Sequence, residues 1–410
     1  MNRREFIAGA AFATGAIAAR AGTDTAPRDF TKLDPNYRNK AVKLDGLCWH
    51  DAFKAPFELE GAPFRDQQDV PTRFPMELTE KMTHPGAYRA MGRQGAGMSL
   101  RFRTNANRIA FRATYGEFYV NQKMPMAGCG FDFYRSGRWA GNSQPPLESK
   151  DGLEWSMSFG DAGRRDGETF QLYFPLQCGI EKLQIGLPET AEVFAPRPRR
   201  YGARPIAFYG SSITHCGCVS RPGLEHGARV GRFLDAAVHN FGYCGNCFGE
   251  LAAADAIASV KPLALVMEYD DNAWNAEHLE KTHEPFFRRF RELCPKTPVL
   301  MMTSPVPLFG ERSRQCVVRT WLAARDRGDR LVDFIDSTAW FDSVADRGDC
   351  FMDGGHQNDI GAEIMAKSIA PCGGGRNFAI ISTSMPKNGM DTAENRDRNK
   401  PNKEKYHGYS

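Results

Sequence analysis

A serine follows a short apolar run at a predicted strand-to-helix turn. Residues 205–209 have the character of a buried strand, and residues 210–214, which come next, read GSSIT. A hydroxyl in that place is a candidate nucleophile. Serine is a poor nucleophile by itself, so Ser212 needs a base, a group that orients the base, and donors for a developing oxyanion.

The second half of the chain offers a base and its orienting group. Residues 353–356 read DGGH and lie between the last predicted strand and a helix expected to start near Asp359. An Asp on such a turn can hold one imidazole nitrogen of His356 while the other nitrogen faces outward. That contact fixes the tautomer and stabilises the imidazolium formed when the base takes a proton. Taken alone, this pattern is more often a surface loop.

Two further loops offer oxyanion donors. The glycine-containing loop at residues 240–246 allows the backbone N–H of Gly245 to point into a cleft, and Asn272 follows the predicted strand at residues 264–269. Either loop alone is better explained as an ordinary turn. Four such loops at four strand ends, carrying Ser, Gly, Asn and His in that order, favour one shared active site.

In this order of motifs the chain resembles the SGNH (GDSL-type) hydrolases, and it is most similar to the branch whose first block reads GSSIT. That branch continues with the pattern found here at residues 218–223 (CVSRPG), and its preceding β-domain carries a Gly-x-Asp-x-Tyr element, here residues 130–134 (GFDFY). The resemblance covers about residues 42–371. It implies Ser212 as nucleophile, His356 as general base and then acid, Asp353 as its orienting partner, and an oxyanion hole formed by the N–H groups of Ser212 and Gly245 with the Asn272 side chain.

Three features depart from the family pattern. The family's commoner Asp before the nucleophile is Ser211 here, which we expect to be tolerated because that position is not the base. Glu268 stands where the branch tends to have Asp. Asp270 and Asp271 add negative charge beside Asn272, which would oppose an oxyanion if they pointed inward.

The periodicity predicts two domains. Alternating segments at residues 98–103, 108–112, 169–174 and 183–187, separated by Gly, Asn and Pro turns, predict an all-β sandwich of jelly-roll type over residues 42–198, and the Arg/Pro-rich residues 195–200 predict a stiff linker. Residues 199–372 alternate short apolar runs (206–209, 264–269, 299–303, 331–335) with helical stretches (277–293, 311–325). That alternation predicts a three-layer α/β/α domain with a parallel sheet, whose active site lies at the carboxyl ends of the strands.

Composition and the first residues bear on location. An apolar content of 41% and a net charge of +4 predict a globular protein with no nucleic-acid partner. Residues 1–21 resemble a twin-arginine signal peptide, with Arg3-Arg4 before a short apolar run, although a chance Arg-Arg pair is the alternative. We expect a linker at residues 22–41, a disordered tail at residues 373–410, a periplasmic or secreted mature protein, and no stable membrane insertion after signal removal.

Two cysteine pairs flank the predicted site loops. The chain has eleven cysteines, among them Cys216 with Cys218 and Cys244 with Cys247. These spacings allow a four-sulfur zinc site, but a closed metal there would crowd the nucleophile. A disulfide between the two loops is the preferred interpretation, and free buried thiols are the simpler alternative. We expect no metal and no cofactor.

The function expected is that of an exported serine esterase, and the resemblance implies O-acetyl groups on carbohydrate as its substrate. Arg221, Trp274 and Tyr134 are candidate substrate contacts, with a surface loop or aromatic packing as the plainer explanation for each. A lipid or short-acyl esterase would use the same residues. A carbohydrate-binding protein with a decayed hydrolase domain is the non-enzymatic alternative. The partner expected is a small-molecule or oligosaccharide ester.

Overall fold

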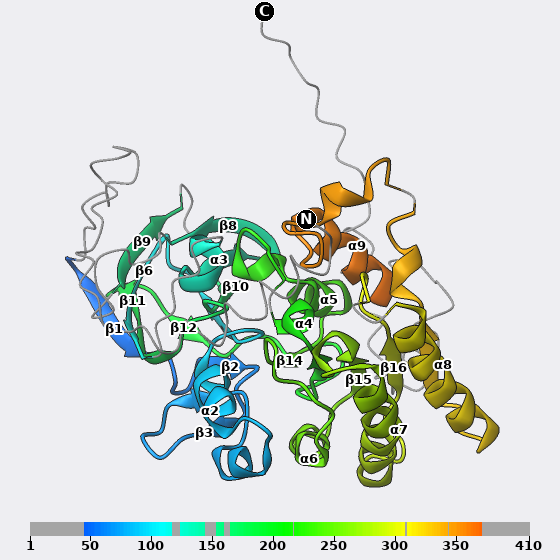
Figure 1. The fold of residues 1–410 in the computed structure, drawn as a ribbon. Coiled ribbons are helices and arrows are strands. Elements are labelled where there is room, and N and C mark those ends of the chain that lie inside the picture. Colours follow the sequence, from blue (N-terminus) through cyan, green and yellow to red (C-terminus); the bar gives the residue numbers. More distant parts are fainter. Residues whose placement is uncertain are drawn as a thin grey trace, which may run out of the picture.

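The computed structural model describes residues 45–116, 124–143, 153–159, 165–215, 217–307, 310–342 and 344–370. The predicted signal peptide, the linker after it and the C-terminal tail lie outside these residues and stay predictions. Within them, an N-terminal region of antiparallel strands lies beside a C-terminal region of alternating strands and helices (Figure 1). The predicted fold class is confirmed.

The N-terminal region is a sandwich of two antiparallel sheets. One sheet has the order β1-β11-β6-β9, and the other has the order β12-β5-β10-β7-β8 with β2 beside β5. Phe102, Phe111, Phe133 and Phe170 come from both sheets and share one buried core, as period-two alternation requires. The strands are β1 Leu47–Asp51, β2 Glu58–Glu60, β5 Ser99–Thr104, β6 Arg108–Tyr115, β7 Asp132–Arg135, β8 Arg138–Asn142, β9 Leu153–Ser158, β10 Glu168–Tyr173, β11 Ile180–Pro188 and β12 Val193–Phe194.

The C-terminal region is a parallel sheet covered on both faces. Its order is β14-β13-β15-β16-β17, with strands β13 Ile206–Gly210, β14 Val238–Gly242, β15 Ala264–Glu268, β16 Val299–Met302 and β17 Val332–Ile335. Alternate strand residues pack against α6 (Leu251–Ser259), α7 (Ala276–Leu293) and α8 (Glu311–Asp326) on one face. The other face packs against α5 (His226–Leu234) and α9 (Asp359–Ile369). Short turns of helix complete it: α4 Ser212–His215, η4 Pro222–Leu224, η5 Asp270–Asn272, η6 Ser337–Ala339 and η7 Arg347–Cys350.

A segment between β2 and β5 packs on the C-terminal sheet. It comprises β3 Phe64–Arg65, β4 Pro71–Thr72, η3 Met76–Lys81 and α2 Pro85–Arg93. Its Phe74 and Tyr88 belong to the same buried core as Tyr243, which follows β14. The fully buried Arg73 donates to the carbonyl oxygens of Asn240 (2.5 Å) and Gly242 (3.1 Å). This guanidinium therefore ties the segment to the edge of the parallel sheet.

The outer face of the six-stranded sheet covers α5. Tyr134 and Tyr173 on that face pack against Ala228, and the guanidinium of Arg232 lies 4.5 Å from the centre of the Tyr134 ring. Residues 195–200, which the sequence predicts as a stiff linker, lie at the same interface. The side chain of Arg199 there is 7% exposed and forms an ion pair with Glu60 (2.7 Å). The remaining helix of the N-terminal region, α3 (Pro125–Cys129), contacts η4.

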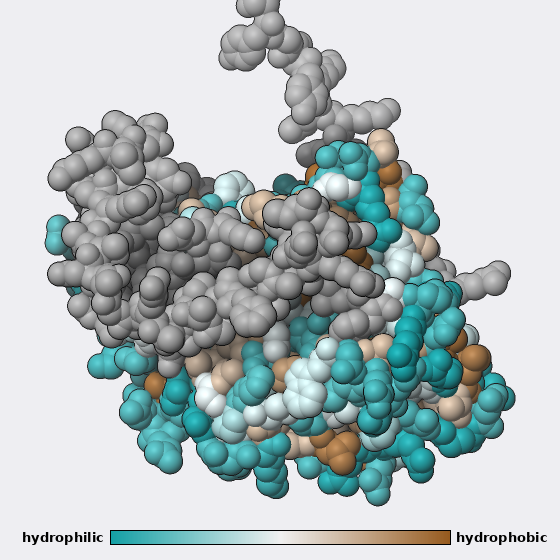
Figure 2. Space-filling model, in the orientation of Figure 1, coloured by the Kyte–Doolittle hydropathy of each residue, from teal (hydrophilic) through white to brown (hydrophobic). Residues whose placement is uncertain are grey.

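No helix in the described part of the chain is long and apolar enough to cross a bilayer. The face shown in Figure 2 is mostly hydrophilic where described residues form it, with hydrophobic residues in small separate groups.

Replacing Arg73 with Met should lower the free energy of unfolding by about 3 kcal/mol, because it leaves buried carbonyl groups without their charged donor. Urea denaturation measures this. Arg89→Met is the matched control, since the partly exposed Arg89 pairs with Glu80 at the surface. Equal stability of the two variants would show that the Arg73 contacts contribute nothing.

Candidate active site

The candidate nucleophile begins α4 directly after β13. Ser211 separates Gly210, the last residue of β13, from Ser212, whose side chain is partly buried. A Cβ atom on Gly210 would lie 2.0 Å from the backbone oxygen of Glu268 on the neighbouring strand, so only glycine fits there. The N–H of Ser211 donates to that same oxygen (3.1 Å). The turn is thus fixed against β15.

A chain of hydrogen bonds joins Ser212 to His356 and Asp353. The Oγ atom of Ser212 lies 2.7 Å from Nε2 of His356, and Nδ1 of His356 lies 2.9 Å from Oδ2 of Asp353. The carboxylate accepts further hydrogen bonds from the backbone N–H groups of His356 and Gly355. Hydrogen bonding from the His356 ring, with these backbone bonds, holds the pKa of Asp353 well below its usual range. An ionised Asp353 favours the proton on Nδ1 and leaves Nε2 free to accept from the serine hydroxyl.

Gln357 holds the histidine loop against the nucleophile turn. Its side chain is fully buried, and its Nε2 donates to the backbone oxygen of Ile213 (2.8 Å). Its own backbone oxygen accepts from the N–H of Cys218 (2.7 Å). Sequence reasoning missed this residue. The only sequence signal was a polar amide next to the histidine, just before a helix.

The two predicted oxyanion loops flank the serine. Strands β14 and β15 lie on either side of β13, with Gly210 in register with Gly242 on one and Glu268 on the other. Gly245 follows β14 with φ of 67°, and nothing lies within 4 Å of where a Cβ atom would stand. Asn272 follows β15, and its Oδ1 accepts from the N–H of Cys247 (3.1 Å). That bond fixes the amide with its NH₂ group available as a donor.

The acidic residues near Asn272 accept hydrogen bonds from other groups. Asp270 is buried and accepts from the N–H of Ser304 (2.9 and 3.1 Å), and Asp271 accepts from the hydroxyl of the same serine. Glu268 accepts from the hydroxyls of Ser211 (2.9 Å) and Thr214 (2.8 Å). Burial, with the charge of Asp271, raises the pKa of Glu268 to about 8. Burial likewise raises the pKa of Asp270.

Of the predicted substrate contacts, Arg221 and Tyr134 lie at the domain interface. Arg221 donates to Oδ1 of Asp132 (2.7 Å), whose Oδ2 accepts from the N–H of Gly223 (3.0 Å). Tyr134 is 5% exposed and packs against Gly223. These two side chains hold the loop after the nucleophile. Trp274 is different, because it is 61% exposed and stands two residues after Asn272.

Three described side chains near the serine have donor atoms close enough to share a metal. Atoms of Cys218, Asp353 and His356 lie within 4.8 Å of one another. A metal bound there would occupy the atoms through which His356 and Asp353 hydrogen-bond to each other and to Ser212. Of the other cysteines, Cys247 is buried with its Sγ 2.8 Å from the oxygen of Gly210. Cys216 lies outside the described residues, so the disulfide between the loops stays a prediction.

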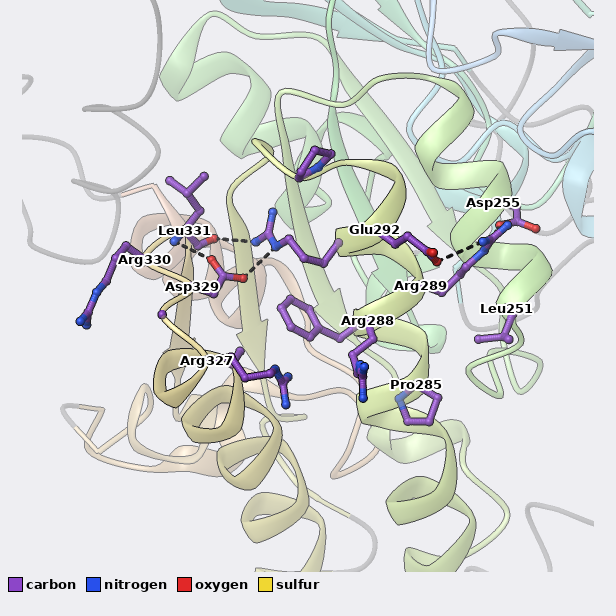
Figure 3. Close-up of a pocket in the computed structure, with 15 residues that line it drawn as sticks. Leu251, Asp255, Pro285, Arg288, Arg289, Glu292, Arg327, Asp329, Arg330 and Leu331 are labelled. Atoms are coloured by element: carbon purple, nitrogen blue, oxygen red, sulfur yellow. Dashed lines mark hydrogen bonds and ion pairs between the residues drawn. The ribbon is translucent and has the colours of Figure 1, made fainter.

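A cavity of about 1080 Å³ lies away from this site. It is lined by α6, the last turns of α7 and α8 and the residues before β17 (Figure 3). These last residues lie at the amino end of a parallel strand, whereas Ser212 follows the carboxyl end of β13. Arg291 pairs there with Asp329 (2.8 Å), and Arg289 pairs with Asp255 (2.7 Å). Arginines at helix C-termini are stabilised by the helix dipole, which is a structural reason for the basic lining.

Comparisons with known proteins agree with this architecture. Residues 203–372 match the GDSL-like lipase/acylhydrolase family, and residues 47–193 match the N-terminus of SGNH hydrolase-type esterases. No curated protein matches the sequence.

Among solved structures, a protein from Bacteroides ovatus described as a GDSL-like lipase has a TM-score of 0.69 at 20% identity, over 82% of this chain and 98% of its own. A salicylyl-acyltransferase from a tetracycline biosynthetic pathway has a TM-score of 0.67 at 18% identity, over 79% of this chain and 96% of its own. An acetyl xylan esterase from Butyrivibrio proteoclasticus has a TM-score of 0.52 at 11% identity, over 79% of this chain and 97% of its own. At these identities the likeness concerns the fold.

Glu268→Gln should change how stability depends on pH. A raised pKa in the folded protein means that Glu268 stabilises fully below its unfolded pKa, near 4.5, and loses this contribution as the pH rises through about 8. The glutamine keeps the hydrogen-bonding shape without the charge. The variant should therefore lose less free energy of unfolding than the native chain between pH 5 and 9, by on the order of a few kcal/mol.

Urea denaturation at several pH values measures this difference. Glu292→Gln, at an exposed glutamate of α7, is the control, and it should follow the native pH dependence. Parallel curves for the native chain and Glu268→Gln would mean that Glu268 is ionised throughout this range.

Proposed function

The chain belongs to the SGNH-type esterases, with a GDSL-like lipase/acylhydrolase domain at residues 203–372, and we propose that it hydrolyses O-acyl esters through an acyl-enzyme formed on Ser212. The observation that carries this proposal is the Ser212–His356–Asp353 chain of hydrogen bonds, at 2.7 and 2.9 Å. A nucleophile in contact with a base, and a base in contact with an ionised carboxylate, is the arrangement that acyl transfer to serine requires.

In the first step, Nε2 of His356 takes the hydroxyl proton as Oγ of Ser212 attacks the ester carbonyl carbon. The carbonyl oxygen becomes an oxyanion, which the N–H groups of Ser212 and Gly245 and the amide of Asn272 stabilise. When this intermediate collapses, the bond to the alcohol oxygen breaks and His356 gives its proton to that oxygen. The alcohol leaves, and the acyl group stays on Ser212.

In the second step, a water molecule takes the place of the alcohol. His356 removes a proton from the water as its oxygen attacks the acyl carbon, and the same proton returns to Oγ of Ser212 when the carboxylic acid leaves. Asp353 remains ionised throughout and stabilises the imidazolium. Its low pKa supports this role.

We further propose O-acetyl groups on carbohydrate as the substrate. The acetyl xylan esterase described above shares the two-domain fold. The exposed ring of Trp274, which stacks on His278 with 4.7 Å between ring centroids, offers a flat apolar surface beside Asn272 on which a sugar ring can lie. Export through the twin-arginine signal proposed at residues 1–21 would bring the enzyme to extracellular polysaccharide.

Ser212→Ala and His356→Ala should each lower kcat for p-nitrophenyl acetate by about 10²- to 10⁴-fold, because each removes a group that acts on the reacting atoms. Thermal unfolding should be nearly unchanged. A fluorophosphonate probe should label the native chain at Ser212 and fail to label Ser212→Ala. The control is Ser259→Ala, an exposed serine on α6. A folded Ser212→Ala variant with native activity would exclude the mechanism.

Trp274→Ala should lower kcat/KM on acetylated xylo-oligosaccharides by roughly two- to tenfold, the size of one aromatic stacking contact. Activity on p-nitrophenyl acetate should stay within twofold, and Trp274→Phe should restore part of the loss. Acetate release measures both. A fall of equal size on both substrates would mean that Trp274 supports the Asn272 loop and does not contact sugar.

A further inference from the structure

A second cavity, of about 470 Å³, lies beside the candidate active site. It lies between α3 of the N-terminal region, the loop after the nucleophile helix, and the start of α9. Its volume is within the range of small-molecule sites. Most of its lining is apolar and comes from Met124, Pro125, Met126, Val219, Met352 and Ile360.

The cavity adjoins the histidine side of the site. Cys218 lines it, and the sulfur of this residue lies within 4.8 Å of donor atoms of both Asp353 and His356. Met352 directly precedes Asp353 in the chain. Gly245 and Asn272, which carry the proposed oxyanion donors, do not line it.

The geometry of ester cleavage determines which part of the ester lies on the His356 side of the site. The alcohol oxygen must receive its proton from Nε2 of His356, so the alcohol part of the ester leaves past the imidazole. The carbonyl oxygen must point the other way, toward Gly245 and Asn272. A cavity beside the imidazole is therefore placed to hold what is attached to the alcohol oxygen.

The polar groups of the cavity are already bonded to each other or to backbone. The hydroxyl of Ser220 donates to Asp359 (2.6 Å), whose other oxygen accepts from the N–H of Ser220 (2.8 Å). The amide of Asn358 donates to the oxygen of Asp349 (2.7 Å) and accepts from the N–H of Ile360 (3.0 Å). A hydroxyl-rich group would exchange its hydrogen bonds to water for few partners here.

The apolar side chains, in contrast, have area to bury. Met352 is 52% exposed and Ile360 is 54% exposed. An alkyl or aryl group would remove this surface from water together with its own. We propose that the cavity binds an apolar alkyl or aryl group carried by the alcohol part of the ester. This inference rests on the proposed cleavage of O-acyl esters by Ser212. For the alcohol part of the ester it favours an apolar group in this cavity, in place of the sugar ring proposed beside Trp274.

Two ester series test it with the full chain in a pH-stat assay. In the first series the acyl group is acetyl and the alcohol grows from methanol to butanol to hexanol. In the second the alcohol is methanol and the acid grows from acetic to hexanoic. We expect kcat/KM to rise along the alcohol series by up to about fourfold per added methylene, and to rise much less along the acid series.

Variants of the lining residues test whether this cavity causes the dependence of kcat/KM on the alcohol. Met352→Ser with Ile360→Ser should lower the ratio of kcat/KM for hexyl acetate to that for methyl acetate by about tenfold or more. Met126→Ser should lower the same ratio. Met126 belongs to α3, an element separate from the histidine loop. Leu322→Ser, at a 46% exposed apolar residue near the end of α8, is the matched control and should leave the ratio unchanged.

The outcomes separate this inference from the proposed function. If methyl acetate is not hydrolysed and the serine probe does not label Ser212, the proposed function fails. If methyl acetate is hydrolysed but neither Met126→Ser nor the double variant changes the ratio, the alcohol-binding cavity is wrong. If the variants instead lower activity along the acid series, the cavity binds the acyl group, and the assignment of its occupant is overturned.

Discussion

The contact between Ser212 and His356 is the interaction on which the rest of the site depends. The two residues are 144 positions apart, and their 2.7 Å separation requires that two loops from different parts of the chain keep fixed positions. The parallel sheet provides one constraint, since it brings the end of β13 to the edge where the later loops return. Gln357 provides the other, because its buried amide bonds the turn of Ser212 at Ile213. A base held this closely needs little reorganisation before it takes the proton.

Elements that follow from local sequence pattern could be predicted. A segment whose position depends on hydrogen bonds to backbone groups far away in the sequence was missed. Strands such as β13 and β15 are short apolar runs between turn residues, and each predicted site loop follows such a run, so periodicity sufficed. The segment of β3, β4 and α2 was not predicted to join the second core. Its anchor is Arg73, which bonds carbonyl groups of β14, and a carbonyl acceptor leaves no mark in side-chain sequence. A buried arginine also contradicts the usual expectation of exposure.

The N-terminal region supports the active-site loop as well as forming a core of its own. Asp132 of the Gly-x-Asp-x-Tyr element is fully buried and bonds both Arg221 and the N–H of Gly223. The loop that these residues fix begins after the nucleophile helix and includes Cys218, next to His356. Arg221 was predicted as a substrate contact because it closely follows the nucleophile in sequence, and Tyr134 because its ring could stack on a sugar. Their partners identify them as contacts between the two regions.

The hydrogen bonds and protonation of the acidic residues near the nucleophile explain why the departures from the family pattern are compatible with one another. A cluster of three carboxylates near Asn272 would oppose an oxyanion if all were ionised and directed at it. Asp270 and Asp271 bond Ser304 instead, and burial favours a protonated Glu268 at neutral pH. Ser211 and Glu268 are each other's partners at 2.9 Å. An aspartate at position 211 would bring another carboxylate against the buried Glu268, so the serine at 211 and the glutamate at 268 are compatible as a pair.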